Sequence, residues 1–74
     1  MRLLLVEDTP DLARAVQDYL RGEGHAVDHA ATLDEAGAAM AVADYACVIL
    51  DLGLPDGSGL SLLRQRRAAG DRTP

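Results

Sequence analysis

The sequence predicts an α/β fold in which a small parallel β-sheet carries helices on both faces. Residues 3–6 (Leu-Leu-Leu-Val) and 47–50 (Cys-Val-Ile-Leu) are short apolar runs, which are typical of parallel strands buried on both faces. A helical stretch follows each of three predicted strands, so strands and helices alternate along the chain. Right-handed crossovers between parallel strands then place helices on both sides of the sheet. With 74 residues, 49% of them apolar, the chain has room for one small domain.

The first helix is predicted between the first two strands. Thr9-Pro10 supplies a hydroxyl near the N-cap and a proline at or near the first helical position, which together signal a helix start. Gly22 and Gly24 end the helix, at about Arg21. Three- and four-residue spacings give this helix one apolar face, made of Leu12, Ala13, Val16, Tyr19 and Leu20.

The second strand is predicted over residues 26–30, and the second helix from Thr32 to about Val42. The strand pattern is weak, because Val27 is its only strongly apolar side chain. Thr32 and Glu35 form a capping box, in which the hydroxyl and the carboxylate can each satisfy an exposed backbone N–H. The helix is rich in alanine, so it has a good intrinsic propensity but few large side chains to bury.

The third strand is predicted over residues 45–50, followed by a turn-rich loop over 53–59 and a helix over 60–69 that ends at Gly70. Leu60 and Leu63 define the apolar face of this helix, but the face continues onto Arg66 and Arg67. Either the arginine stems lie along the edge of the core and send their guanidinium groups to water, or the last turn is frayed. We favour the first interpretation.

Composition and charge exclude several classes of function. Twelve acidic residues against seven basic ones give a net charge of −5, and every basic residue is an arginine. The chain therefore lacks the basic patch that binds nucleic acid or anionic membranes, and Tyr19 and Tyr45 alone make no base-stacking platform. No apolar run is long enough to span a bilayer, and the N-terminus lacks the layout of a signal peptide. The single Cys47 lies in an apolar strand, which predicts a buried, reduced thiol and a cytoplasmic location.

Carboxylates follow two of the predicted strands. Glu7 and Asp8 come directly after the first strand, and Asp51 comes directly after the third. Because the carboxyl ends of parallel strands meet at one edge of the sheet, we expect these three side chains to share one crevice. Carboxylates held together repel one another unless a cation compensates them, and hard divalent metals prefer oxygen ligands. The sequence therefore predicts a divalent metal site, with Mg²⁺ as the leading candidate.

Two other patterns are weaker. His25 and His29 share one face of the second predicted strand, but without a third ligand they indicate ordinary surface or strand-edge histidines rather than a metal site. Gly53, Gly57 and Gly59 match neither the dinucleotide-binding fingerprint nor the P-loop, which also requires a lysine.

Taken together, these residues resemble the receiver domain of bacterial two-component response regulators over the whole chain. The resemblance rests on Val6-Glu7-Asp8, on Asp51 and on residues 52–59 (Leu-Gly-Leu-Pro-Asp-Gly-Ser-Gly), whose separations also look like those of the family. Residues 1–8 and 51–57 look most like the subfamily whose receivers precede a winged-helix DNA-binding domain.

The resemblance implies that Asp51 is the phosphoacceptor, which takes a phosphoryl group from a histidine kinase or a small phosphodonor. It implies that Glu7 and Asp8 hold Mg²⁺, directly or through water, together with the Asp51 carboxylate and the main-chain carbonyl of Gly53. Phosphoryl transfer needs mainly positioning and charge neutralisation, and a metal held by two strand ends supplies part of each. The chain is then a signalling domain rather than an enzyme, and a transcription-regulating effector domain lies elsewhere in the full-length protein.

The same resemblance implies a flavodoxin-like, doubly wound sheet with strand order 2-1-3-4-5, truncated here to the first three βα units. Pro55 and Gly57 then shape the loop after the third strand. Residues 72–74 stand where the fourth strand would begin, so we expect residues 1–74 to be a partial receiver that lacks the family's hydroxyl residue and lysine of strands four and five. The open edge of the third strand and its uncovered apolar surface predict self-association, or a partly molten state.

Two other functions stay open at this stage. A magnesium-dependent phosphohydrolase of doubly wound fold would use an aspartate after the first strand, but such enzymes resemble Asp-x-Asp there, where this chain has Glu7-Asp8-Thr9. A receiver-like interaction module that no longer signals would also fit a chain without the hydroxyl and the lysine. Acyl-phosphate formation separates the receiver from this module, and phosphatase turnover would identify the hydrolase.

Overall fold

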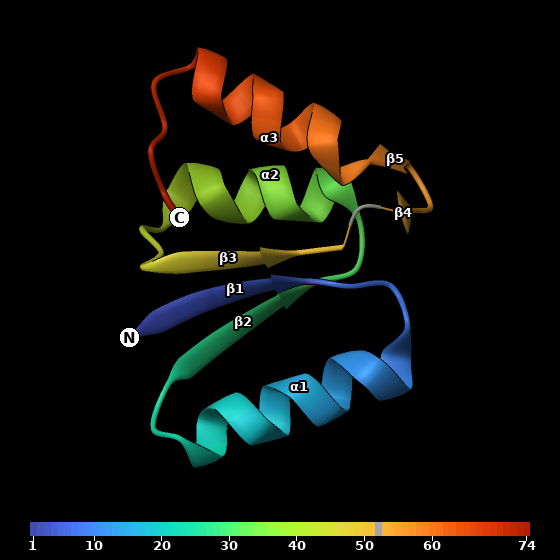
Figure 1. Ribbon diagram of the computed structural model, residues 1–74, viewed down its shortest axis with the longest axis vertical. Helices are drawn as coiled ribbons and strands as arrows, with labels where there is room; N and C mark the ends of the chain where they lie inside the picture. Colours follow the sequence, from blue (N-terminus) through green and yellow to red (C-terminus); the bar gives the residue numbers. More distant parts are fainter. Residues whose placement is uncertain (52) are drawn as a thin grey trace.

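The parallel sheet has three strands, β1 (Arg2–Val6), β2 (Ala26–Ala30) and β3 (Cys47–Leu50), in the order β2-β1-β3 (Figure 1). This computed structural model describes residues 1–51 and 53–74, so Leu52 of the predicted loop motif lies outside the described residues. Both neighbours pair with β1 in parallel, which confirms the predicted α/β class with its first three βα units. The third strand begins two residues later than predicted.

The helices divide between the two faces of the sheet, as predicted. Helix α1 (Pro10–Gly22) covers one face, while α2 (Leu33–Val42) and α3 (Gly59–Ala68) cover the other (Figure 1). Alternation along β1 explains this division, because Leu4 and Val6 point toward α2 and α3, whereas Leu5 packs against Ala13 of α1. The central strand is therefore covered on both sides.

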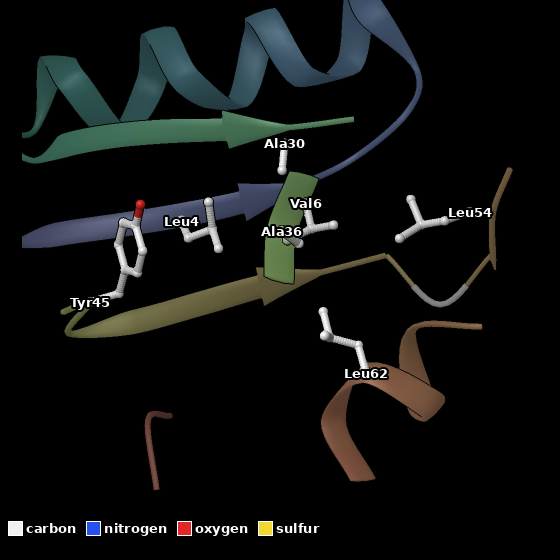
Figure 2. Packing of buried hydrophobic residues seen from close by; sticks show 7 residues of the cluster. All are labelled: Leu4, Val6, Ala30, Ala36, Tyr45, Leu54 and Leu62. Carbon is white, nitrogen blue, oxygen red and sulfur yellow. The ribbon is translucent and has the colours of Figure 1, made fainter. Parts of the chain in front are cut away.

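The larger hydrophobic cluster lies between the sheet, α2 and α3, as Figure 2 shows. Leu4 and Val6 are fully buried at its centre, and burying a side chain of this size stabilises the fold by about 1.5–3 kcal/mol. Ala36 of α2 and Leu62 of α3 pack against them on this face of the sheet. The small side chain at Ala36 explains how an alanine-rich helix packs closely against β1 and β2.

A two-stranded antiparallel hairpin, β4 (Gly53–Leu54) and β5 (Gly57–Ser58), occupies the segment predicted as a loop. Gly53 pairs with Ser58, and Leu54 pairs with Gly57. The Leu54 side chain is buried in the larger cluster, which attaches the hairpin to the body of the domain (Figure 2).

Helix α1 has the predicted apolar face, but this face is only partly buried. Leu12 is 51% exposed and Tyr19 is 68% exposed, whereas Ala13 is buried and Val16 and Leu20 pack beside it. Each residue advances about 100° around a helix, so the neighbours of Ala13 and Leu20 lie on the flank of the buried stripe. The covered part of the sheet is narrow, and only the centre of the stripe meets it.

The prediction that the third strand is buried on both faces was also wrong. Cys47 is only half-buried, and Ile49 is 39% exposed. The cause is position, because β3 is an outer strand among the described residues and only β1 has a neighbour on each side.

At the C-terminal end of α3 the arginine stems line the core edge as predicted, but the prediction that their guanidinium groups point to water was wrong. The helix continues to Ala68, so the last turn is not frayed. The Arg66 side chain lines an apolar groove, but its Nε donates to Asp71 Oδ2 over 3.2 Å rather than pointing to water. Arg67 Nη1 donates to the Asp71 carbonyl over 3.0 Å, so both arginines hold Asp71 against the C-terminal end of α3.

Residues 71–74 return from the end of α3 toward β3, and the chain ends close to that strand (Figure 1). The Val48 N–H donates to the Pro74 carbonyl over 2.7 Å, so one position of that edge is already paired. The groove between α2, β3, α3 and this segment has a volume of about 320 Å³ and is lined by Met40, Leu50 and Leu63, among others. The edge that the sequence predicts as open is thus partly covered.

Candidate functional site

The sheet holds three predicted site residues at its carboxyl edge. Val6, the last residue of β1, aligns with Leu50, the last residue of β3. The ladder continues one residue further, because the Asp51 N–H donates to the Val6 carbonyl over 2.9 Å and the Glu7 N–H donates to the Ala30 carbonyl over 3.0 Å. Backbone hydrogen bonds therefore fix the points from which Glu7 and Asp51 project.

The structure brings together the carboxylates of Glu7, Asp8 and Asp51. One ligand atom from each lies within 4.8 Å of the others, with Glu7 and Asp51 half-buried and Asp8 exposed. Octahedral Mg²⁺, with metal–oxygen distances of about 2.1 Å, places its ligand oxygens roughly 3–4 Å apart. The spacing and the all-oxygen donor set therefore fit this ion with small adjustments of the side chains.

Two further contacts hold the Glu7 segment. The Thr9 N–H donates to Glu7 Oε1 over 3.1 Å, which bends the chain between β1 and α1. His29 Nε2 lies 2.7 Å from the Glu7 carbonyl oxygen, and since a carbonyl only accepts, this nitrogen is the donor. His25 instead places Nδ1 3.4 Å from the amino group of Met1. The two histidines thus have different partners, as expected of ordinary strand-edge histidines, although sequence reasoning missed the contact of His29 with the site.

The remaining predicted residues lie in the hairpin that follows Asp51. Gly53 begins β4, Pro55 lies between the two short strands, and Gly57 begins β5 with a φ of 146°. That φ strains any residue with a side chain, which supports the structural role predicted for Gly57.

Sequence reasoning missed Asp56, which lies in the same hairpin. Its Oδ1 accepts from the Leu33 N–H over 2.8 Å and its Oδ2 accepts from the Asp34 N–H over 3.0 Å. These bonds, first of all the one from Leu33, lower the pKa of Asp56 below its usual value. The only signal available in the sequence was an aspartate in a turn, with nothing to connect it to a helix more than twenty residues earlier.

The sequence of this chain matches a known protein family. A family profile described as "Response regulator receiver domain" matches residues 3–74. The chain belongs to this family. The predicted resemblance is thereby confirmed, and the three-stranded sheet with its helices is the corresponding part of a flavodoxin-like receiver fold.

Two curated relatives of this receiver chain are named as transcriptional regulatory proteins. It is 47% identical over 74 residues to the probable transcriptional regulatory protein y4xI of Sinorhizobium fredii, covering all of this chain and 32% of that protein. It is 49% identical over 67 residues to the transcriptional regulatory protein PmrA of Pectobacterium parmentieri, covering 90% of this chain and 30% of PmrA. The chain thus spans about a third of the length of these relatives.

Solved receiver structures superpose closely on this one. The non-phosphorylated HemR receiver domain from Leptospira biflexa matches 99% of this chain and 59% of its own, with a TM-score of 0.91 and 33% identity. The response regulator TrrA from Thermotoga maritima, in complex with Mg²⁺-BeF, matches 92% of this chain and 59% of its own, with a TM-score of 0.87 and 32% identity. None of the helices in the described part of the receiver chain is long and apolar enough to cross a membrane.

Proposed function

We propose that residues 1–74 form the amino-terminal part of a phosphorelay receiver in which Asp51 accepts the phosphoryl group. The observation that supports this most directly is the gathering of Glu7, Asp8 and Asp51 at the ends of two paired strands. A phosphohydrolase with Asp8 as nucleophile is less well supported, since family membership and the relatives both point to signalling.

In the proposed reaction an oxygen of the Asp51 carboxylate attacks the phosphorus of a phosphohistidine on a kinase, or of a small acyl phosphate. The new P–O bond makes Asp51 an acyl phosphate, while the P–N bond to the imidazole, or the P–O bond to the carboxylic acid, breaks and that group leaves with the electron pair. Glu7, Asp8, Asp51 and the Gly53 carbonyl would hold Mg²⁺, which supplies positive charge beside the transferring oxygens. The chain's own contribution is to hold Asp51 at a fixed point of the ladder, ready to attack.

Partners and setting follow from the same proposal. A histidine kinase donates the phosphoryl group, and an effector domain of winged-helix type, outside residues 1–74, regulates transcription in the cytoplasm. Both relatives described above are named as transcriptional regulatory proteins, which supports this assignment. An acidic segment with a net charge of −5 leaves contact with DNA to the effector domain.

The test is the intact mass of the protein after incubation with acetyl phosphate and Mg²⁺, with Asp51→Asn as the control. We expect a gain of one phosphoryl group in the native chain and none in the variant. Continuous release of inorganic phosphate that depends on Asp8 would identify a phosphohydrolase instead. A folded, Mg²⁺-binding chain that never gains mass would identify an interaction module without phosphoacceptor activity.

We also propose that this segment associates with a second copy of itself along the outer edge of β3. Ile49 is 39% exposed on that strand, and Leu60 and Leu63 are exposed on the adjacent α3. Sedimentation should show a dimer that Ile49→Lys weakens, because a charge at a strand edge opposes pairing. Leu12→Lys is the matched control, because Leu12 is exposed on α1, the helix that packs against β2 rather than against β3. A monomer at all concentrations, with sharp and dispersed amide resonances, would contradict the proposal.

A further inference from the structure

Side chains satisfy each of the first three N–H groups of α2, which a helix cannot satisfy internally. The Glu35 N–H donates to Thr32 Oγ1 over 3.1 Å, as the predicted capping box requires. The Leu33 and Asp34 N–H groups donate to the two carboxylate oxygens of Asp56. This second cap comes from the β4–β5 hairpin, so it ties two separate segments together.

A close packing contact accompanies these hydrogen bonds. A Cβ added at Gly57 would lie 3.1 Å from Leu33 Cδ1, so the hairpin backbone rests directly against the first residue of α2. Leu54 enters the same hydrophobic cluster as Ala36 of α2. A hairpin with two residue pairs has little stability of its own, so these contacts determine where it lies.

The position of this hairpin matters for the site because Gly53, whose carbonyl is a proposed metal ligand, is the first residue of β4. Gly53 pairs with Ser58 in the hairpin, so the contacts that hold Asp56 and Gly57 against α2 also restrict where the Gly53 carbonyl lies. We infer that Asp56 is a positioning residue for the metal site, and that its cap couples Mg²⁺ binding at the sheet edge to the N-terminus of α2. This inference rests on the proposed function, since it needs Mg²⁺ to bind there.

Coupling between two sites is reciprocal. If the cap favours the hairpin position that binds Mg²⁺, then Mg²⁺ must favour the capped state of α2. In the native protein, Mg²⁺ should therefore slow hydrogen exchange of the Leu33 and Asp34 amides, the two donors to Asp56. The Glu35 amide serves as an internal reference, because Thr32 rather than the hairpin caps it.

The variant that tests the coupling is Asp56→Asn. An asparagine side chain has one acceptor oxygen in place of two, so it can serve only one of the two N–H groups. We expect its dissociation constant for Mg²⁺ to rise by about fivefold, and the effect of Mg²⁺ on the Leu33 and Asp34 amides to disappear. The matched control is Asp34→Asn, which removes one negative charge from the same helix end but leaves both donated hydrogen bonds in place. It should change the dissociation constant by less than about twofold.

The outcomes separate the inference from the proposed function. If Mg²⁺ shifts no resonance of Glu7, Asp8 or Asp51 in the native protein, the proposed metal site fails and the inference fails with it. If Mg²⁺ binds there but Asp56→Asn melts at a lower temperature with an unchanged dissociation constant, the cap is merely structural and only the inference fails. Should Asp56→Asn not fold, the native exchange experiment decides alone: no slowing at Leu33 and Asp34 overturns the coupling.

Discussion

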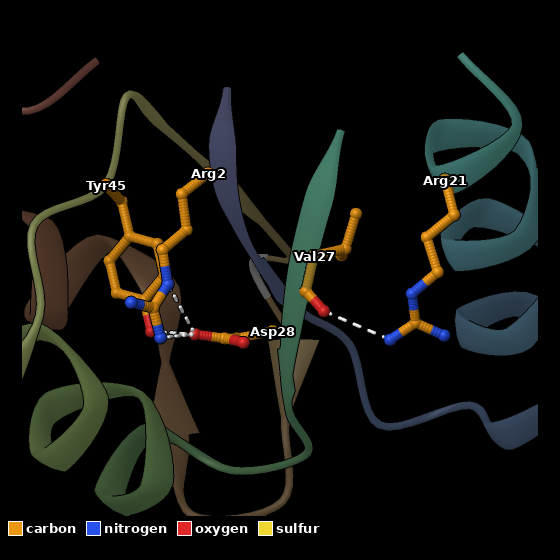
Figure 3. Close-up of polar contacts among 5 residues, drawn as sticks. All are labelled: Arg2, Arg21, Val27, Asp28 and Tyr45. Atoms are coloured by element: carbon orange, nitrogen blue, oxygen red, sulfur yellow. Dashed lines mark hydrogen bonds and ion pairs between the residues drawn. The ribbon is translucent and has the colours of Figure 1, made fainter. Parts of the chain in front are cut away.

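The carboxylates at the two ends of the three-stranded sheet have opposite electrostatic surroundings. Toward the amino end, Asp28 Oδ2 accepts hydrogen bonds from Arg2 Nη2 over 2.8 Å and from the Tyr45 hydroxyl over 2.7 Å (Figure 3). The Arg2 guanidinium also lies 5.5 Å from the centre of the Tyr45 ring. At the carboxyl end, Glu7, Asp8 and Asp51 converge on one another. At the amino end, a cation and a hydroxyl compensate the carboxylate, whereas at the carboxyl end three like charges lie close together.

The contacts at the amino end shift the pKa values of Asp28 and Tyr45. The hydrogen bond from Tyr45, followed by that from Arg2, lowers the pKa of Asp28. Burial, followed by the hydrogen bond to Asp28, raises the pKa of Tyr45. Nearby, Arg21 of α1 donates to the Val27 carbonyl over 3.0 Å, which attaches the end of that helix to β2 (Figure 3). The amino end therefore stabilises the fold, whereas the carboxyl end holds three neighbouring carboxylates whose repulsion a cation would relieve.

Addition of Mg²⁺ should have the largest effect on stability, because the ion would neutralise the three carboxylates at the carboxyl end of the sheet. At a concentration about a hundredfold above its dissociation constant, a ligand that binds only the folded state stabilises it by about 2.7 kcal/mol. For a domain of this size, that raises the melting temperature by roughly 10–20 °C, which calorimetry or circular dichroism will measure.

Removal of one ligand serves as the control for this effect. Asp8→Asn should stabilise the metal-free protein slightly, because it relieves repulsion among the carboxylates, and should greatly reduce the shift that Mg²⁺ causes. Asp28→Asn should leave the size of that shift unchanged. An equal shift in native protein and Asp8→Asn would mean that Mg²⁺ binds elsewhere.

Loss of the Asp28 carboxylate should have the next largest effect on the melting temperature. Asp28→Ala leaves the Tyr45 hydroxyl without its acceptor, and an unsatisfied, mostly buried hydroxyl costs about 1–2 kcal/mol after allowance for the exposure of the Arg2–Asp28 pair. We expect a melting temperature lower by roughly 5–10 °C and an unchanged affinity for Mg²⁺. Tyr45→Phe keeps the ring in the core and removes only the donor, so its loss should be smaller. A native melting curve for Asp28→Ala would show that this network contributes no net stability.

Much of this fold could be predicted because its signals are local. The capping box fixed the start of α2, and the apolar runs located β1 and most of β3. The β4–β5 hairpin could not be predicted, since two residues per strand are too few to show an alternating pattern. The exposure of Leu12 and Tyr19 was equally hidden, because it depends on how much of the sheet lies beneath α1.

The candidate site divides in the same way. The convergence of Glu7, Asp8 and Asp51 could be predicted because parallel topology alone brings strand ends to one edge. The contacts of His29 with Glu7 and of Asp56 with α2 could not, because each joins residues 22 or more positions apart through tertiary packing. Their side chains carry no local pattern that names a partner.

Asp71 is another carboxylate with hydrogen-bonding and charged partners, and its contribution to stability should depend on pH. Hydrogen bonds from Thr73, and then from Arg66, lower the pKa of Asp71 to about 2. Because the pKa in the unfolded chain is about 3.9, the stabilisation is complete above that value and is lost as the pH falls toward 2. The difference in melting temperature between native protein and Asp71→Asn should therefore be constant near neutral pH and shrink between about pH 4 and pH 2. A difference that does not change over that range would show that Asp71 acts through packing alone.

The smallest effect should come from changing the shape of a cation without changing its charge. Arg2→Lys keeps the positive charge opposite Asp28 but loses the planar fork, which now donates through both Nε and Nη2, and the stacking on Tyr45. The side chains of Arg2 and Asp28 are 54% and 41% exposed, so solvent screens this pair and the variant should melt only slightly below the native protein. Arg2→Met removes the charge as well and should melt lower than Arg2→Lys. If the two variants melt together well below the native protein, the geometry of the guanidinium group rather than its charge completes the amino end, and the contrast with the carboxyl end is one of shape as much as of electrostatics.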